Sequence, residues 1–348
     1  MPTVYDLTHE QLTAHLVAWG EPAFRARQLW MQLWKRAATY DQMTDVSAAL
    51  RDRLASDLPL GVEVLDERTA DRGATRKALL RLGGEHIIET VLMGYRDRVT
   101  VCVSSQSGCA MGCTFCATGQ MGFKNNLTSG EIAAQVVWAR REAARLPPST
   151  PQRLSNVVFM GMGEPLGNER NVFAAITRLT DPQAFGLGAR HVTVSTVGLV
   201  PGIRHLTTAH PQAGLAVSFH AASDELRSQL VPPNDLYPLA ALETAMAEWR
   251  STTHRRPSIE WAMIHQVNDT EEQAGLLAPI ARRLGAHVNL IPLNPTPGYR
   301  VVGSSRSRIR RFVGVLERAK VNVTVRDTRG RAIDAACGQL ALAAEASR

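Results

Sequence analysis

The sequence predicts an α/β fold in which parallel strands alternate with helices, as in a wound sheet or a barrel. From residue 128 onward, apolar runs of roughly four to six residues alternate with longer segments of helical periodicity. Strands joined through helices pair in parallel. No glycine fingerprint of the dinucleotide type follows the first strand, which disfavours a nicotinamide-binding sheet. The 348 residues, 45% of them apolar, suffice for about two globular domains.

The N-terminal part predicts helices over residues 6–58, because apolar side chains such as Leu29, Trp30 and Leu33 recur at helical spacing. This pattern indicates a small helical domain, although the first layer of one larger domain explains it nearly as well. Strands are expected next at 78–82, 86–93 and 99–104, forming a lead-in sheet that ends at a cluster of cysteines.

The remaining elements follow in strict alternation. A helix begins at Thr128, where Glu131 completes a capping box. The expected helices are 128–146, 171–179, a short helix ending at 205, 224–230, 239–249, 271–284 and 307–319. The expected strands are 156–160, 191–195, 215–219, 258–264, 288–291 and 321–325.

Polar side chains gather where the predicted strands end. In barrels, chemistry takes place at the loops that follow the carboxyl ends of the strands. The residues at such places are Cys109, Cys113, Cys116, Gly161, Gly163, Glu164, Ser195, Thr196, Ser218, His220, Asn268, Asp269 and Asn294, with Cys337 beyond the last strand. Together they predict one functional rim.

The charge balance favours a polyanionic partner without proving one. Lys and Arg number 39 against 32 Asp and Glu, a formal net charge of +7. Basic residues concentrate in 300–331, where only Glu317 and Asp327 oppose them, so phosphate contact is favoured over a merely solvated face. The chain begins without a signal-peptide pattern and has no apolar run long enough to span a membrane, which predicts a cytoplasmic protein with no membrane partner.

Three cysteines form the strongest motif. Cys109, Cys113 and Cys116 have the spacing C-x3-C-x2-C. Three thiolates from one loop can hold a four-iron cluster and leave one iron open to a chelating molecule. The alternative is a structural zinc ion with Cys102 as fourth ligand, but zinc sites favour paired C-x2-C halves, so the cluster is preferred.

At these residues the chain resembles the radical S-adenosylmethionine superfamily, whose motif also has an aromatic residue, here Phe115, before the last cysteine. The run Gly161-Met162-Gly163-Glu164-Pro165 resembles the superfamily's Gly-Gly-Glu-Pro motif. The segments around Cys102, Glu164, Asn294 and Cys337 resemble the RlmN/Cfr family of RNA methyltransferases, and more closely its RlmN branch. The resemblance implies a partial (β/α)6 radical-SAM barrel with a small N-terminal helical domain and lead-in β-strands.

The resemblance also implies a reaction. Methylation of carbon 2 of adenosine would use two S-adenosylmethionine molecules per turnover and a [4Fe-4S] cluster held by Cys109, Cys113 and Cys116. One molecule would methylate Cys337; cleavage of the second would give a 5′-deoxyadenosyl radical that activates this methyl group for radical addition to the base. Glu89 would remove the ring proton, and a transient disulfide between Cys102 and Cys337 would release the product.

Each of these roles has a simpler alternative. Glu89 alternates with apolar neighbours and could be an exposed strand carboxylate. Cys102 in an apolar strand could be a buried structural thiol. The resemblance implies that Gly163, Glu164, Ser195, Ser218, Phe219, His220 and Asn294 contact S-adenosylmethionine. For His220, a capping or core histidine is about as consistent.

The implied substrates are 23S rRNA near the peptidyl-transferase centre and certain tRNAs beside the anticodon, with flavodoxin or ferredoxin as electron donor. We expect a helical RNA-binding accessory domain at 1–60, a linking β segment at 61–98, the barrel with its catalytic cysteine loop at 99–340, and a tail at 341–348. The helix 307–319, with Arg308 and Arg311, is expected to grip RNA. The alternatives are a Cfr-like enzyme that methylates carbon 8, and a zinc-containing RNA-binding assembly factor.

Overall fold

A computed structural model describes residues 3–83, 86–294, 302–326, 330 and 333 of the chain. In these ranges ten strands form one sheet. In spatial order they are β1 (Val62–Ala70), β2 (Thr75–Leu82), β3 (His86–Gly94), β4 (Val99–Cys102), β7 (Asn156–Phe159), β8 (Val192–Thr196), β9 (Gly214–Ser218), β10 (Ser258–Met263), β11 (His287–Pro292) and β12 (Asn322–Val325). The pairings from β1 to β4 are antiparallel, and those from β4 to β12 are parallel.

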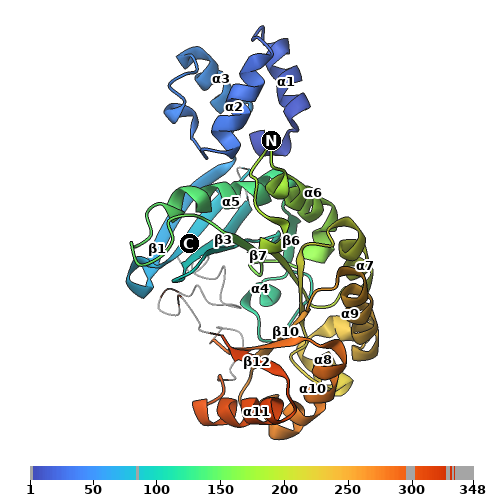
Figure 1. The fold of residues 1–348 in the computed structure, drawn as a ribbon. Coiled ribbons are helices and arrows are strands. Elements are labelled where there is room, and N and C mark those ends of the chain that lie inside the picture. The colour runs from blue at the N-terminus through green and yellow to red at the C-terminus, as the bar shows by residue number, and fades with distance from the viewer. Residues whose placement is uncertain (1–2, 84–85, 295–301, 327–329, 331–332, 334–348) are drawn as a thin grey trace.

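The parallel part of the sheet is built from six β/α units. Strands β4, β7, β8, β9, β10 and β11 each lead through a helix into the next strand, and β12 adds one more strand. The helices are α4 (Ala117–Gln120), α5 (Ser129–Ala143), α6 (Glu169–Thr180), α7 (Val200–Ala209), α8 (Asp224–Leu230), α9 (Leu239–Thr253), α10 (Glu271–Leu284) and α11 (Arg306–Arg318). Figure 1 shows α5, α6, α7, α9, α10 and α11 along the outer side of the curved sheet. The predicted partial (β/α)6 barrel is what the structure contains.

Three short helices precede the sheet and lie at one end of the molecule (Figure 1). They are α1 (His9–Ala18), α2 (Phe24–Trp34) and α3 (Ala48–Asp57). Their buried side chains belong to the same hydrophobic cluster as the barrel core. The Asp6 carboxylate accepts the backbone N–H of Gly130 at 2.7 Å in the first turn of α5, where the helix dipole favours a negative charge. The Arg178 guanidinium donates to the carbonyls of Tyr5, Asp6 and Leu7. The helical region therefore packs directly on α5 and α6, while the boundaries 1–60 and 61–98 stay predictions.

Strand β1 and a short hairpin were not expected from the sequence. Strand β1 is a charged edge strand with little buried surface, so it lacks the apolar alternation that identifies a half-buried strand. The second is a small hairpin of β5 (Gln106–Gly108) and β6 (Phe123–Asn126), whose second strand is mostly exposed. This hairpin brackets the cysteine loop. Within the described ranges, none of the helices is long and apolar enough to cross a membrane.

Candidate active site

The cysteine loop is fixed at both ends by backbone contacts. The N–H of Cys109 donates to the carbonyl of Gly122 at 3.0 Å, and the N–H of Thr114 donates to the carbonyl of Leu230 at 3.2 Å. Gly108 has φ +74°, and a Cβ there would lie 2.0 Å from the Gly122 oxygen, so this close approach requires glycine. The loop is thus held between the β5–β6 hairpin and α8.

Burial keeps the cysteine thiols protonated in the absence of a metal. It raises the pKa of Cys109 to about 12 and that of Cys113 well above its usual value, and the neighbouring thiols raise both further. Among the described residues, no three His, Cys, Asp or Glu side chains converge as ligands of one ion. Thiolates need a bound metal or a nearby cation to be stable in such surroundings. The loop supplies three cysteines whose charges influence one another, a donor set that suits an iron–sulfur cluster with three protein ligands, but in this structure their side chains do not converge on one point.

The glycine motif after β7 places a carboxylate beside this loop. A Cβ on Gly161 would lie 2.7 Å from the Val103 carbonyl oxygen, and Gly163, at φ +93°, packs against the side chain of Gln106. The Gln106 Oε1 accepts the backbone N–H of Glu164 at 2.8 Å. Gly161 and Gly163 are needed because the chain approaches other segments closely at both positions. These contacts fix the backbone position of Glu164.

The Glu164 carboxylate is buried, and its partners are backbone N–H groups and a hydroxyl rather than a cation. Its two oxygens accept the N–H groups of Leu166 at 3.0 Å and Val197 at 2.8 Å. Burial raises its pKa to about 7, although these hydrogen bonds and one from Thr196 oppose the rise. In the part of the chain that the structure describes, Glu164 forms no ion pair. A buried carboxylate without a cation is a suitable partner for the amino group of a ligand.

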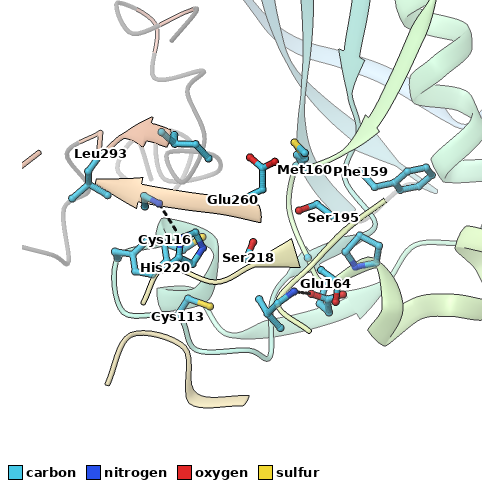
Figure 2. Close-up of a pocket in the computed structure, with 18 of the residues that line it drawn as sticks. Cys113, Cys116, Phe159, Met160, Glu164, Ser195, Ser218, His220, Glu260 and Leu293 are labelled. Carbon is cyan, nitrogen blue, oxygen red and sulfur yellow. Dashed lines mark hydrogen bonds between the residues drawn. The ribbon is translucent and has the colours of Figure 1, made fainter. Parts of the chain in front are cut away.

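One pocket connects the carboxylate and the cysteines. Its empty volume is about 860 Å³, which includes space open to solvent. Figure 2 shows Cys113, Cys116, Glu164, Ser195, Ser218 and His220 around it. Gly163 also lines the pocket, together with Phe115, Phe159, Met160, Glu260, Leu293 and Arg326. The structure therefore brings together seven of the predicted site residues from four different strand ends.

His220 is a neutral histidine in this wall. Burial lowers its pKa to about 3, and Arg227 lowers it further. Its Nδ1 accepts the backbone N–H of Ala262 at 2.9 Å, which leaves Nε2 as the protonated nitrogen. Its ring contacts that of Phe115 edge to face, with centroids 4.7 Å apart. His220 thus offers the pocket one N–H donor and no charge.

Two predicted ligand residues do not line the pocket. The Phe219 side chain is fully buried in the core, and its backbone N–H donates to the carbonyl of Glu260 at 3.1 Å. Asn294 is buried just beyond β11. Their contact with S-adenosylmethionine stays a prediction.

Glu89 and Cys102 lie in the lead-in part of the sheet, away from the pocket lining. Glu89 is buried on β3 and forms an ion pair with Lys77 of β2, with 2.8 Å between Nζ and Oε1. Cys102 is buried on β4 directly opposite Val91, so the side chains of Glu89, Val91 and Cys102 share one face of the sheet. The exposed-carboxylate alternative for Glu89 is wrong, because only 1% of its surface is accessible. Cys337, and with it the predicted Cys102–Cys337 disulfide, lies outside the described residues.

Sequence reasoning missed two charged residues of this region, Glu260 and Lys77. Glu260 of β10 lines the pocket and accepts the Asn289 Nδ2 at 2.7 Å; burial raises its pKa, which Arg326 lowers in turn. Lys77 was not paired with Glu89 because strand register cannot be read from residue types alone. Lys77 also lies before the predicted strand 78–82, so nothing in the sequence indicated that it belongs to β2.

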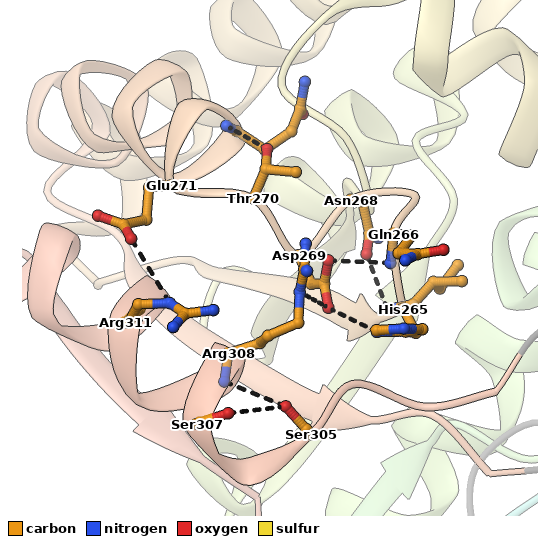
Figure 3. Close-up of polar contacts among 12 residues, drawn as sticks. His265, Gln266, Asn268, Asp269, Thr270, Glu271, Ser305, Ser307, Arg308 and Arg311 are labelled. Atoms are coloured by element: carbon orange, nitrogen blue, oxygen red, sulfur yellow. Dashed lines mark hydrogen bonds and ion pairs between the residues drawn. The ribbon is translucent and has the colours of Figure 1, made fainter.

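The basic helix α11 is tied to the neighbouring loop by ion pairs (Figure 3). Arg308 Nε lies 2.8 Å from Asp269 Oδ2, and the Asp269 side chain is completely buried. Arg311 forms a longer, exposed pair with Glu271 at 3.6 Å. Arg308 therefore holds the loop after β10, which weakens the expectation that it grips RNA. Arg306, Arg310 and Arg318 are exposed and form no ion pair with any described residue.

Known proteins resemble this chain over almost its whole length. Residues 3–59 match the family model described as "Ribosomal RNA large subunit methyltransferase N-terminal domain". A probable dual-specificity RNA methyltransferase RlmN from Chloroflexus aurantiacus is 48% identical over 347 residues, covering 97% of this chain and 92% of the relative. One from Salinispora tropica is 52% identical, covering 93% of this chain and 88% of the relative. The chain belongs to the RlmN family.

A solved structure gives the same result for the fold. The crystal structure of a radical SAM methyltransferase from Sphaerobacter thermophilus matches with a TM-score of 0.93 and 46% identity, and covers 98% of this chain. This confirms the predicted radical-SAM barrel and the prediction of a methyltransferase. The relatives do not support the alternative of a non-catalytic zinc protein.

Proposed function

We propose that this chain methylates carbon 2 of adenosine in 23S rRNA, at the peptidyl-transferase centre, and in certain tRNAs next to the anticodon. The observation that carries the proposal is the pocket bounded by Cys113 and Cys116 of the cysteine loop on one side and by the buried Glu164 carboxylate, which has no cation partner among the described residues, on the other. The names of the RlmN relatives support RNA as the substrate. The family resemblance supports carbon 2 as the target.

In this proposal Cys109, Cys113 and Cys116 hold a [4Fe-4S] cluster, which when bound supplies the electron that cleaves a sulfonium ligand. Glu164 binds the amino group of S-adenosylmethionine by charge, since its backbone hydrogen bonds fix both carboxylate oxygens. The hydroxyl groups of Ser195 and Ser218 and the Nε2–H of His220 line the same pocket and contact other polar atoms of the ligand.

The remaining roles concern the transfer of the methyl group to the base and the release of the product. Cys337 carries the methyl group that is transferred to the base, and Glu89 accepts the ring proton. The thiolate of Cys102 then attacks the sulfur of Cys337, so that a disulfide forms and the methylated base leaves. Lys77 holds the Glu89 carboxylate in place in the buried sheet through their ion pair. One S-adenosylmethionine provides the methyl group, and a second is cleaved.

The decisive experiment is anaerobic reconstitution with iron, sulfide, S-adenosylmethionine and 23S rRNA fragments, with reduced flavodoxin or ferredoxin as electron donor. We expect about four irons per chain, 2-methyladenosine by mass spectrometry, and a methylated Cys337 peptide. The Cys113→Ala variant should lose the cluster and the product, while Cys102→Ala should accumulate RNA bound to the protein. Product at carbon 8 would establish the Cfr-like alternative, and a colourless zinc protein would overturn the proposal.

A further inference from the structure

Arg227 is a fully buried arginine that belongs to neither the cysteine loop nor the motif of Glu164. It lies on α8, the helix against which the cysteine loop packs: Leu230 of α8 and Cys113 share one small apolar cluster. None of the described carboxylates lies within ion-pair distance of its guanidinium. Asp224 is the carboxylate whose charge acts on Arg227, but it accepts the backbone N–H of Leu239 at 2.8 Å instead of pairing with the guanidinium.

All five N–H donors of Arg227 have oxygen partners. Nε donates to the carbonyl of Phe219 at 3.1 Å, and Nη2 donates to the carbonyls of Val197 at 2.6 Å and Ser218 at 3.0 Å. Nη1 donates to the Asn234 side chain at 2.8 Å and, more weakly, to the carbonyl of Tyr237 at 3.5 Å. A guanidinium is a rigid planar fork, so these bonds fix the ends of β8 and β9 relative to each other.

The peptide of Val197 links this network to the ligand pocket. Its carbonyl accepts Arg227, and its N–H donates to Glu164 Oε2 at 2.8 Å. Ser218, whose carbonyl Arg227 also binds, lines the same pocket. Arg227 thus positions Val197, one of the partners of Glu164, without lining the pocket itself.

The second property of Arg227 is its charge. Burial lowers its pKa to about 10, against the opposing influence of Cys113 and Asp224, so the side chain is cationic at neutral pH. The same charge lowers the pKa of Cys113. A four-iron cluster held by three thiolates gains one negative charge on reduction, and a nearby buried cation favours the more negative state.

We propose that Arg227 is a positioning residue with two effects: it fixes the loops that hold S-adenosylmethionine, and its uncompensated charge raises the reduction potential of the cluster. The inference rests on the proposed function only in requiring that a [4Fe-4S] cluster forms on the cysteine loop. The reduction in question takes one electron from an external low-potential donor and transfers no proton or group.

The test compares Arg227→Met, which removes charge and hydrogen bonds, with Arg227→Lys, which keeps a charge but not the fork. The midpoint potential of the reconstituted cluster is measured by spectroscopic titration with dithionite, and S-adenosylmethionine affinity by calorimetry. For Arg227→Met we expect a potential lower by at least 59 mV, a tenfold loss in the equilibrium constant for one-electron reduction. For Arg227→Lys we expect a potential near wild type and at least tenfold weaker binding. Arg178→Met is the matched control, because Arg178 also binds backbone carbonyls but lies at the N-terminal segment; it should change neither value.

The possible outcomes distinguish a failure of the proposed function from a failure of the inference about Arg227. If wild-type protein forms no cluster, the proposed function fails before Arg227 is examined. If the cluster forms and Arg227→Met leaves its potential unchanged, the inference is overturned. A cluster that assembles with Arg227→Lys but not with Arg227→Met supports the role of charge. Unfolding of both variants, judged by circular dichroism, would reduce Arg227 to a structural residue and overturn the inference as well.

Discussion

Glu89 and Glu164 are both almost completely buried, yet the protein compensates their charges in opposite ways. In the lead-in sheet, Glu89 is paired with the ammonium group of Lys77 at 2.8 Å. At the end of β7, Glu164 has backbone N–H donors but no cation, and its pKa rises to about 7. The comparison teaches that the charge of Glu89 is already neutralised by a side chain of the protein, so Glu89 needs no ligand to balance it. Glu164 has no such partner among the described residues and can therefore bind a cationic group of a ligand.

The largest effect is expected where the completed pair is broken. Lys77→Met leaves the Glu89 carboxylate buried without its cation, which should lower the free energy of unfolding by about 3–5 kcal/mol in urea. Arg81→Met is the matched control on the same strand, because its pair with Glu63 is exposed and should contribute less than about 1 kcal/mol. Recovery of stability in the double variant Lys77→Met with Glu89→Leu would confirm the reason. Equal effects of the two single variants would contradict it.

The pH dependence of stability should reveal the carboxylate without a cation. Between pH 4.5 and about 7 the folded protein keeps the Glu164 proton that the unfolded chain has lost, so the stability of cluster-free protein falls as the pH rises through this window. The contribution is about 3 kcal/mol and is constant above pH 7. Urea unfolding at pH 5 and pH 7.5 measures it. In Glu164→Gln this part of the pH dependence should disappear, and parallel pH profiles for the two proteins would show that the assignment is wrong.

The affinity for S-adenosylmethionine should change with pH in the opposite direction to the stability of the protein. Glu164→Gln removes the charge that the amino group needs, so S-adenosylmethionine should bind about 10- to 150-fold more weakly to cluster-loaded protein, corresponding to about 1.5–3 kcal/mol. Wild-type affinity should increase from pH 6 to pH 8, because the carboxylate must lose its proton before it binds a cation. Glu169→Gln, at a half-buried position at the start of α6 outside the pocket, should leave affinity unchanged. An unchanged affinity in Glu164→Gln would remove Glu164 from the ligand site.

The parts of this site that could be predicted are those that depend on neighbours in the sequence. The cysteine spacing and the glycines before Glu164 are local patterns, since the chain must turn and approach itself within a few residues. The alternation of strands and helices is likewise local, and it predicted the barrel units well. Edge strand β1 escaped prediction because its side chains are charged and largely exposed.

The parts that could not be predicted depend on contacts between distant segments. Lys77 meets Glu89 only because β2 and β3 pair in one particular register. Arg227 gathers carbonyl groups from three separate loops, and carbonyl groups carry no sequence signal. The basic segment 300–331 was judged by its composition, which cannot distinguish Arg308, paired with buried Asp269, from its unpaired neighbours.

The smallest effect is expected on the protein surface, where arginines of α11 with and without a carboxylate partner can be compared. Arg306 and Arg310 are exposed on α11 and have no carboxylate partner among the described residues, so they are free for phosphate contact. The double change to Gln should weaken RNA binding and lower the slope of log affinity against log salt by about 1.4–1.8, without loss of stability. Arg308→Gln should instead lower stability by about 1–3 kcal/mol, because it leaves Asp269 buried without its guanidinium. Filter binding at several salt concentrations and urea unfolding measure the two effects, with Arg170→Gln on α6 as an exposed control. If Arg308→Gln weakened RNA binding more than the double variant and left stability intact, Arg308 would be an RNA contact. The assignment of Arg308 to the fold and of Arg306 and Arg310 to RNA would then be wrong.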